Sequence, residues 1–309
     1  MSETIAPPDG FLVGHWTDAV GITGCTAVIA PSGSRAGVDV RGGGPGTRET
    51  DVIGPLAGTA EVTAVMLTGG SAYGLAAADG AMRWCEHNGR GYATPGGLVP
   101  IVPAAVIYDL ASGDPQARPG AEAGYSACAA ALGAVPETGR VGAGTGAAVG
   151  KILGRERGAP GGVGYAAGHT GAGITVAVIA VVNAFGDVIG GSGEVLAGPA
   201  GGAGERLRSA ELIAAMKTAP EWPRLEERNT TLVCAMTDAA LDKPACARVA
   251  RMASAGVARA VDPVFSDVDG DVAFCVASGL PATSDRFASL AVGSLVAPLT
   301  AAAIRDAVR

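Results

Sequence analysis

The feature that most constrains the fold is an apolar run of nine residues at positions 174–182, which is rich in isoleucine and valine and interrupted only by a threonine. Such a run is too short for a typical helix, so it predicts a central strand. Apolar runs at 25–30, 62–67, 102–110, 230–236 and 272–276 predict further strands. Amphipathic segments at 73–87, 122–132, 204–216, 244–261 and 284–307 predict helices, the last one interrupted at Pro298. Strands and helices that alternate along the whole chain indicate an α/β or α+β fold.

Glycine is unusually frequent, with 49 glycines among 309 residues, and charged residues make up only 17%. The hydrophobic fraction of 48% argues against disorder. The glycines follow no Gly-x-y period, which excludes collagen, and no uninterrupted apolar run approaches the roughly 18 residues that span a bilayer. These features predict a compact protein built from small residues and without a membrane span. By length it is one large domain or two small ones, and we expect a single domain over residues 1–309.

The charge and the cysteines limit the partners and the compartment. A formal net charge of -7 disfavours nucleic acid as a partner, because phosphate binding needs a basic surface. The first residues show neither the basic nor the apolar region of a secretory signal. Six cysteines are scattered at positions 25, 85, 128, 234, 246 and 275 without a CxxC pair. We therefore expect buried, reduced thiols and a cytoplasmic protein.

Several familiar motifs fail on inspection. Residues 142–147 fit a loose dinucleotide pattern, but no convincing strand precedes them and no acidic residue follows at the required distance. Residues 150–151 lack the glycine and hydroxyl positions of a P-loop, and 267–271 lack the glycine and glutamate of a calcium loop. The three histidines, at 15, 87 and 169, have no metal-ligand spacing. We expect no cofactor and no metal.

A polar segment at 217–229, with two prolines and several charges, leads directly into the apolar strand through Asn229, Thr230 and Thr231. A threonine hydroxyl is a weak nucleophile and needs a base. One solution is the α-amine of the same threonine, which exists only if the bond before Thr230 is cut. Cleavage there would give chains 1–229 and 230–309. The pattern alone favours an ordinary strand start after an exposed linker.

A series of short motifs resembles the self-processing N-terminal-nucleophile amide hydrolases, the family of L-aminopeptidase/D-amidase/D-esterases, β-aminopeptidases and nylon-oligomer hydrolases. The resemblance extends from about residue 10 to residue 295. The matching segments are 13–18 (VGHWTD), 39–43 (DVRGG), 45–51 (PGTRETD), 67–75 (LTGGSAYGL), 102–109 (VPAAVIYD), 142–151 (GAGTGAAVGK), 181–184 (VVNA), 229–231 (NTT) and 269–271 (DGD). Each motif alone is weak, but nine in order are specific.

The resemblance implies a layered αββα sandwich, autocleavage between Asn229 and Thr230, and no metal or organic cofactor. Thr230 corresponds to the nucleophile and Lys151 to a lysine beside it, where a cation would lower the pKa of the new amine and help to accept the hydroxyl proton. Asn183 matches the asparagine that stabilises the oxyanion. Without the resemblance, Lys151 could be a surface lysine and Asn183 a residue of a turn at a strand end.

Three further residues receive roles from the resemblance. Asp269 and Asp271 correspond to the pair that orients the lysine and the threonine amine, and Tyr108 to a tyrosine that hydrogen-bonds at the site. The alternatives are a hairpin turn for Asp269-Gly270-Asp271 and a core position for Tyr108.

The implied activity is hydrolysis of short linear amides that carry a free amine: small peptides, amino-acid amides or 6-aminohexanoate-type oligomers. The Asn-Thr and Asp-Gly-Asp motifs are more similar to the nylon-oligomer hydrolases, whereas residues 47–50 and 68–71 are closer to the peptidases, so the substrate stays open. The resemblance also implies a homo-oligomer, often a tetramer of processed units. Two alternatives remain: an acyltransferase of the ornithine-acetyltransferase type, which shares the fold and a threonine nucleophile, and a relative that folds without cleaving itself.

Overall fold

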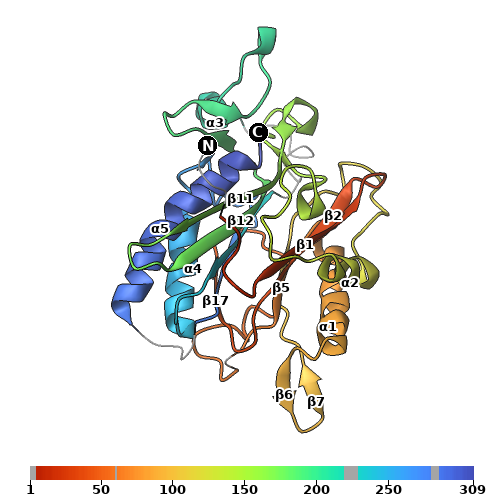
Figure 1. Ribbon diagram of the computed structural model, residues 1–309. Coiled ribbons are helices and arrows are strands. Elements are labelled where there is room, and N and C mark those ends of the chain that lie inside the picture. Colours follow the sequence, from red (N-terminus) through yellow and green to blue (C-terminus); the bar gives the residue numbers. More distant parts are fainter. Residues whose placement is uncertain (1–4, 60, 219–228, 280–284) are drawn as a thin grey trace.

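The protein has four layers in the order helix, sheet, sheet, helix (Figure 1). The computed structural model describes residues 5–59, 61–218, 229–279 and 285–309. The first sheet has the strand order β1-β2-β5-β8-β4 and the second β11-β12-β15-β17-β3. Helices α1 (Ala77–His87) and α2 (Ala121–Ala129) lie against the first sheet, and α4 (Lys243–Val257) and α5 (Arg286–Asp306) against the second.

The strands of the first sheet are β1 (Leu12–Asp18), β2 (Thr23–Ile29), β5 (Ala64–Thr68), β8 (Ala104–Val106) and β4 (Thr47–Arg48). Those of the second are β11 (Gly162–His169), β12 (Thr175–Asn183), β15 (Thr230–Thr237), β17 (Val272–Ala277) and β3 (Arg35–Val40). Both sheets are mostly antiparallel, with one parallel pair each, β5 with β8 and β15 with β17.

Shorter elements complete the fold. Two small sheets have two strands each: β6 (Tyr92–Thr94) pairs with β7 (Gly97–Val99), and β9 (Ala148–Val149) pairs with β10 (Ala159–Pro160). A third has three strands, in which β13 (Asp187–Ile189) lies between β14 (Val195–Ala197) and β16 (Val261–Asp262). The remaining helices are η1 (Ser71–Ala76), η2 (Gly142–Gly144), η3 (Arg155–Arg157), η4 (Gly202–Gly204) and α3 (Ser209–Ala215).

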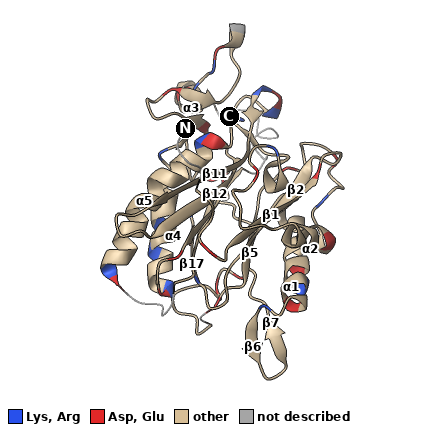
Figure 2. Cartoon of the chain, in the orientation of Figure 1, with Lys and Arg blue, Asp and Glu red and all other residues tan. Residues whose placement is uncertain are grey.

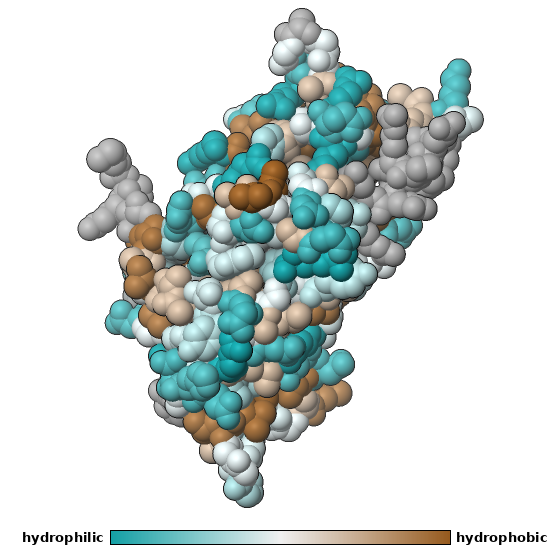
Figure 3. Space-filling view, turned by 90° about the vertical axis from the view of Figure 1, so that its right-hand side faces the viewer, coloured by the Kyte–Doolittle hydropathy of each residue, from teal (hydrophilic) through white to brown (hydrophobic). Residues whose placement is uncertain are grey.

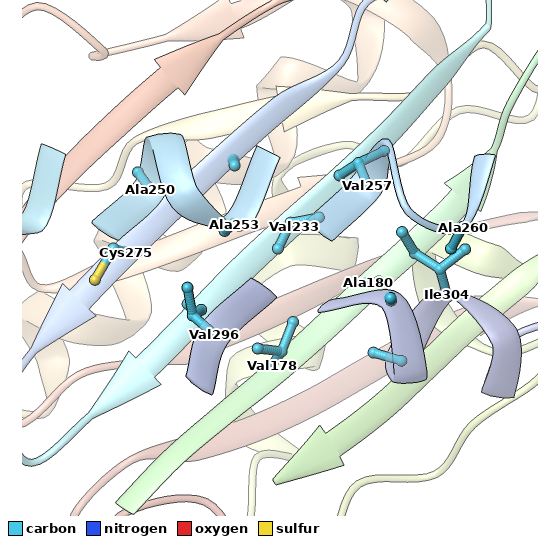
Figure 4. Close-up of a cluster of buried hydrophobic side chains, with 14 of the residues drawn as sticks. Val178, Ala180, Val233, Ala250, Ala253, Val257, Ala260, Cys275, Val296 and Ile304 are labelled. Atoms are coloured by element: carbon cyan, nitrogen blue, oxygen red, sulfur yellow. The ribbon is translucent and has the colours of Figure 1, made fainter. Parts of the chain in front are cut away.

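The apolar runs that predict buried strands supply both faces of the second sheet. Alternate side chains of a strand point to opposite faces, so in β12 Val178 and Ala180 face the helices while Ile179 and Val181 face the first sheet. Figure 4 shows the helix side of this core, where Val178 and Val233 of the sheet pack against α4 and α5. A third cluster lies between the first sheet and the helices α1 and α2. Three apolar clusters therefore separate the four layers.

Three expectations from the sequence need correction. Helix α5 continues through Pro298. Buried residues on both sides of the proline, such as Val296 and Ala301, pack against the rest of the protein and stabilise one continuous helix. The expected strand over 102–110 is reduced to β8, while η1 precedes the helix expected from residue 73. The linker expected at 217–229 falls largely on residues 219–228, which lie outside the described residues.

Within the described part of the chain, one helix, α5, is long and apolar enough by length and composition to cross a membrane. Half of its apolar window is buried inside the protein, as expected for a core helix. Charged residues are sparse and lie mainly on helices and loops (Figure 2). On one face of the molecule, apolar residues occur in several separate groups among polar ones (Figure 3). All six cysteines are buried and free.

Candidate active site

The second sheet brings the candidate residues together at one end. Strands β12 and β15 pair antiparallel in a register that places Asn183 opposite Thr230. Asn229 forms a parallel bridge with Asp269, just before β17 pairs with β15. The end of β12, the start of β15 and the segment before β17 therefore meet at a single point.

The peptide bond between Asn229 and Thr230 is buried at this point. The Thr230 hydroxyl donates a short hydrogen bond to the carbonyl oxygen of Asn229. The backbone N–H of Gly270 donates to the same oxygen, with an N–O distance of 2.6 Å. The Thr230 side chain thus lies next to the carbonyl of its own preceding residue, and that carbonyl is polarised by a second donor.

Lys151 reaches the site from the loop after β9. A side chain at Gly150, which has φ +65°, would come within 2.5 Å of the Gly198 backbone, so the chain needs glycine to turn here. The Lys151 ammonium donates hydrogen bonds of 3.0 Å to the backbone carbonyl of Asn183 and to its Oδ1. Lys151 is only 3% exposed, which excludes an ordinary surface lysine.

The side chain of Asn183 is held in a fixed orientation. Its Oδ1 accepts hydrogen bonds from the Lys151 ammonium and the Ala148 N–H, and its Nδ2 donates to the carbonyl oxygen of Tyr108 at 3.1 Å. Oδ1 can only accept and Nδ2 can only donate, so these partners determine the orientation of the side-chain amide.

The two aspartates are buried and influence each other. Asp269 accepts hydrogen bonds from Ser266 and from the Phe185 N–H, whereas Asp271 accepts from the Thr231 and Phe265 N–H groups. Burial raises the pKa of Asp269, although these hydrogen bonds and the Lys151 charge oppose the rise. Burial and the nearby Asp269 carboxylate raise the pKa of Asp271 to about 8. At neutral pH, the aspartate pair therefore holds a proton.

A pocket of about 350 Å³ opens onto the Thr230 side chain. It is lined by Gly43, Gly44, Pro45, Gly46, Ser71, Ala72, Val106, Tyr108 and Thr230. None of these lining residues carries a charged side chain. The pocket can hold a short, uncharged portion of a substrate next to the threonine hydroxyl.

The structure thus gathers all the residues singled out in the sequence: Asn229, Thr230, Lys151, Asn183, Asp269, Asp271 and Tyr108. Sequence reasoning missed Ser266, which hydrogen-bonds Asp269 from an otherwise featureless turn. It also missed the Gly270 N–H, since a backbone donor leaves no mark in the sequence. Among the described residues, no group of three or more His, Cys, Asp or Glu side chains could hold a metal ion.

The fold is that of known amide hydrolases. A β-aminopeptidase from Burkholderia sp. matches 99% of this chain and 88% of its own, with a TM-score of 0.70 and 20% identity. The L-aminopeptidase D-Ala-esterase/amidase of Ochrobactrum anthropi, described as a variant of the Ntn hydrolase fold, matches over the same shares with a TM-score of 0.66 and 19% identity. The protein therefore has an N-terminal-nucleophile type of hydrolase fold.

The sequence comparisons identify the family. The chain belongs to peptidase family S58, whose model matches residues 4–308. An uncharacterized aminopeptidase of Mycobacterium tuberculosis is 44% identical over 276 residues, which is 88% of this chain and 76% of the relative. A 6-aminohexanoate-oligomer endohydrolase of Paenarthrobacter ureafaciens is 28% identical over 262 residues, or 83% of this chain and 69% of the relative. The protein is thus an amide-bond hydrolase.

Proposed function

We propose that this hydrolase matures by cutting its own bond between Asn229 and Thr230, and that the released Thr230 is the nucleophile for short amide substrates. The observation that carries the proposal is the hydrogen bond from the Thr230 hydroxyl to the Asn229 carbonyl, which places the nucleophile beside the bond to be broken. The products would be chains of 1–229 and 230–309.

In the self-cleavage step, the Thr230 oxygen attacks the Asn229 carbonyl carbon, and negative charge develops on the carbonyl oxygen. The Gly270 N–H already points at that oxygen and stabilises this charge. The carbon–nitrogen bond then breaks, and the hydroxyl proton ends on the departing nitrogen of Thr230. Water hydrolyses the resulting ester, which frees the Thr230 hydroxyl and leaves a carboxylate on Asn229.

In turnover, the new α-amine of Thr230 accepts the hydroxyl proton as the oxygen attacks the substrate amide. Nδ2 of Asn183 has two N–H groups and gives one to the Tyr108 carbonyl, so we assign the other to the substrate oxyanion. The Lys151 ammonium supports this donor by binding Oδ1 of the same amide. The amine product leaves, and water releases the acyl group.

The substrate class follows from the pocket and the relatives. A pocket of about 350 Å³ lies at the small end of the range of ligand pockets, which favours short linear amides. The relatives named as aminopeptidases and as 6-aminohexanoate-oligomer hydrolases support small peptides, amino-acid amides and oligomers of that type. We further propose a homo-oligomer of processed units in the cytoplasm; the six free cysteines support a reducing compartment.

The test is denaturing gel electrophoresis with N-terminal sequencing of the purified protein. We expect two fragments, the smaller beginning at Thr230, and hydrolysis of amino-acid p-nitroanilides or 6-aminohexanoate oligomers. Thr230→Ala should stay intact and inactive. An uncut wild-type chain, a fragment that begins at Thr231, or cleavage that persists in Thr230→Ala would each overturn the mechanism.

A further inference from the structure

The pocket wall opposite the catalytic strand contains a residue in an unusual backbone conformation. Ser71 directly follows Gly70 and has φ +53°, in the left-handed region that side chains other than glycine rarely adopt. Such a conformation is strained in a residue other than glycine, and it persists only where the surroundings hold it. Glycine would occupy this position without strain.

Buried contacts fix the Ser71 backbone. Its N–H donates to the Ile107 carbonyl at 3.0 Å, and the neighbouring Gly70 N–H donates to Oδ1 of Asp109 at 2.6 Å. Asp109 is 2% exposed, and its Oδ2 accepts a hydrogen bond from the Thr23 hydroxyl. The loop is therefore fastened to residues 107–109 by its backbone and by a buried carboxylate.

The same segment connects this wall to the candidate oxyanion donor. Tyr108 lies between the two residues that hold the loop, and its carbonyl accepts the hydrogen bond from Asn183 Nδ2. Ser71, Tyr108 and Thr230 line one pocket. The position of Ser71 relative to the nucleophile is thus fixed through Tyr108 and Asn183.

The Ser71 side chain, unlike its backbone, is not held by hydrogen bonds within the described part of the chain. Its hydroxyl makes no hydrogen bond to any residue in the described ranges, although it lines the pocket. Glu49 offers a contrast. Its backbone also has a left-handed conformation, with φ +54°, but its carboxylate accepts a hydrogen bond from the Val102 N–H. A strained residue that lines the pocket, and whose hydroxyl has no hydrogen-bond partner among the described residues, indicates a role in binding.

We propose that Ser71 is a substrate-binding residue: its hydroxyl hydrogen-bonds the amide substrate beside Thr230, on a wall held in place by the Gly70–Asp109 contact. The pocket lining has no charged side chain, so the partner of Ser71 is an uncharged N–H or C=O of the substrate. This inference rests on the proposed function, because it takes Thr230 as the nucleophile of the same pocket.

The test compares Ser71→Ala and Ser71→Gly with wild type in three measurements: self-cleavage, melting temperature and steady-state kinetics on one amide substrate. Both variants should self-cleave normally and raise KM about five- to tenfold with little change in kcat, as expected for loss of one neutral hydrogen bond in substrate binding. Ser71→Gly should also melt at a higher temperature than Ser71→Ala, because only glycine removes the strain.

Glu49→Gly is the matched control. It relieves the strain of the same left-handed conformation at a position outside the pocket lining, and KM should stay at the wild-type value. A KM within twofold of wild type in both Ser71 variants, or a loss of self-cleavage in them, would overturn the role of Ser71. A wild-type chain that neither cleaves itself nor hydrolyses amides would instead refute the proposed function, so the two failures are distinguishable.

Discussion

The protonated state of Asp271 can be tested by replacing it with its neutral isostere. Asp271→Asn is best made in the Thr230→Ala chain, which under the proposed mechanism stays uncut and keeps the surroundings described above. Asparagine retains an oxygen that can accept the Thr231 N–H hydrogen bond and cannot ionise. The variant therefore resembles the protonated side chain at every pH.

The expected change in the free energy of unfolding with pH follows from the linkage between protonation and folding. The pKa of Asp271 is about 8 in the folded chain and about 3.9 when unfolded, so the folded state binds the proton more tightly. This contribution to stability is complete below the unfolded pKa and is lost as the pH rises through about 8. Between pH 5 and pH 8 the loss is about 4 kcal/mol. Urea unfolding of Thr230→Ala and Thr230→Ala/Asp271→Asn across this range measures the loss as a difference, in which the titrating groups that do not interact with Asp271 cancel.

We expect the stability of the single variant to fall with pH relative to the double variant. Asp267, an exposed aspartate in the same loop, provides the control, since Asp267→Asn should leave the pH profile unchanged. Parallel profiles with and without Asp271→Asn would refute a proton held on Asp271 near neutral pH. If the unfolding free energy of the single variant instead fell relative to that of the double variant as the pH is lowered, the sign would be opposite. That result would show that Asp271 is ionised in the folded chain.

Three other substitutions address separate parts of the site. Gly270→Ala should slow self-cleavage on a time-course gel, because its Cβ would come within 2.9 Å of the Thr230 hydroxyl, whereas Gly58→Ala, with open space around it, should not. Asn183→Ala should lower kcat of any processed enzyme by about 10²–10³-fold if its amide binds the oxyanion; an unchanged kcat would remove it from that role. Lys243→Met should destabilise the fold by about 2–3 kcal/mol in urea unfolding, because it leaves three backbone carbonyls at 2.6–3.0 Å without their ammonium donor; an unaltered midpoint would contradict this.

The apolar runs predicted the centre of the fold well, because buried strands need apolar residues on both faces. Strands β12, β15 and β17 all coincide with such runs. Strands β1, β3 and β11 escaped prediction. Their sequences mix small, polar and glycine residues, as in β11 (GVGYAAGH), and they become strands only by pairing with a neighbour.

The site was accessible from the sequence only where a side chain carries the chemistry. The motifs around Lys151, Asn183 and Thr230 pointed to residues that the structure brings together. The backbone donor Gly270 and the left-handed Ser71 could not be located in this way. Their roles depend on where an N–H points and on which φ a residue is forced to adopt, and both are set by the packing of distant segments.

The surplus of glycine has a physical explanation in how the aspartate pair is enclosed. Residues 41–44 lie directly on the backbone of the segment that holds Asp269 and Asp271, and the Gly44 N–H donates to the Asp269 carbonyl at 2.8 Å. A Cβ at Gly42 would lie 2.3 Å from that same carbonyl oxygen, so any larger residue would push the two segments apart. Close backbone contact excludes water from the carboxylates, and this exclusion raises their pKa values and keeps a proton in a site that has no histidine.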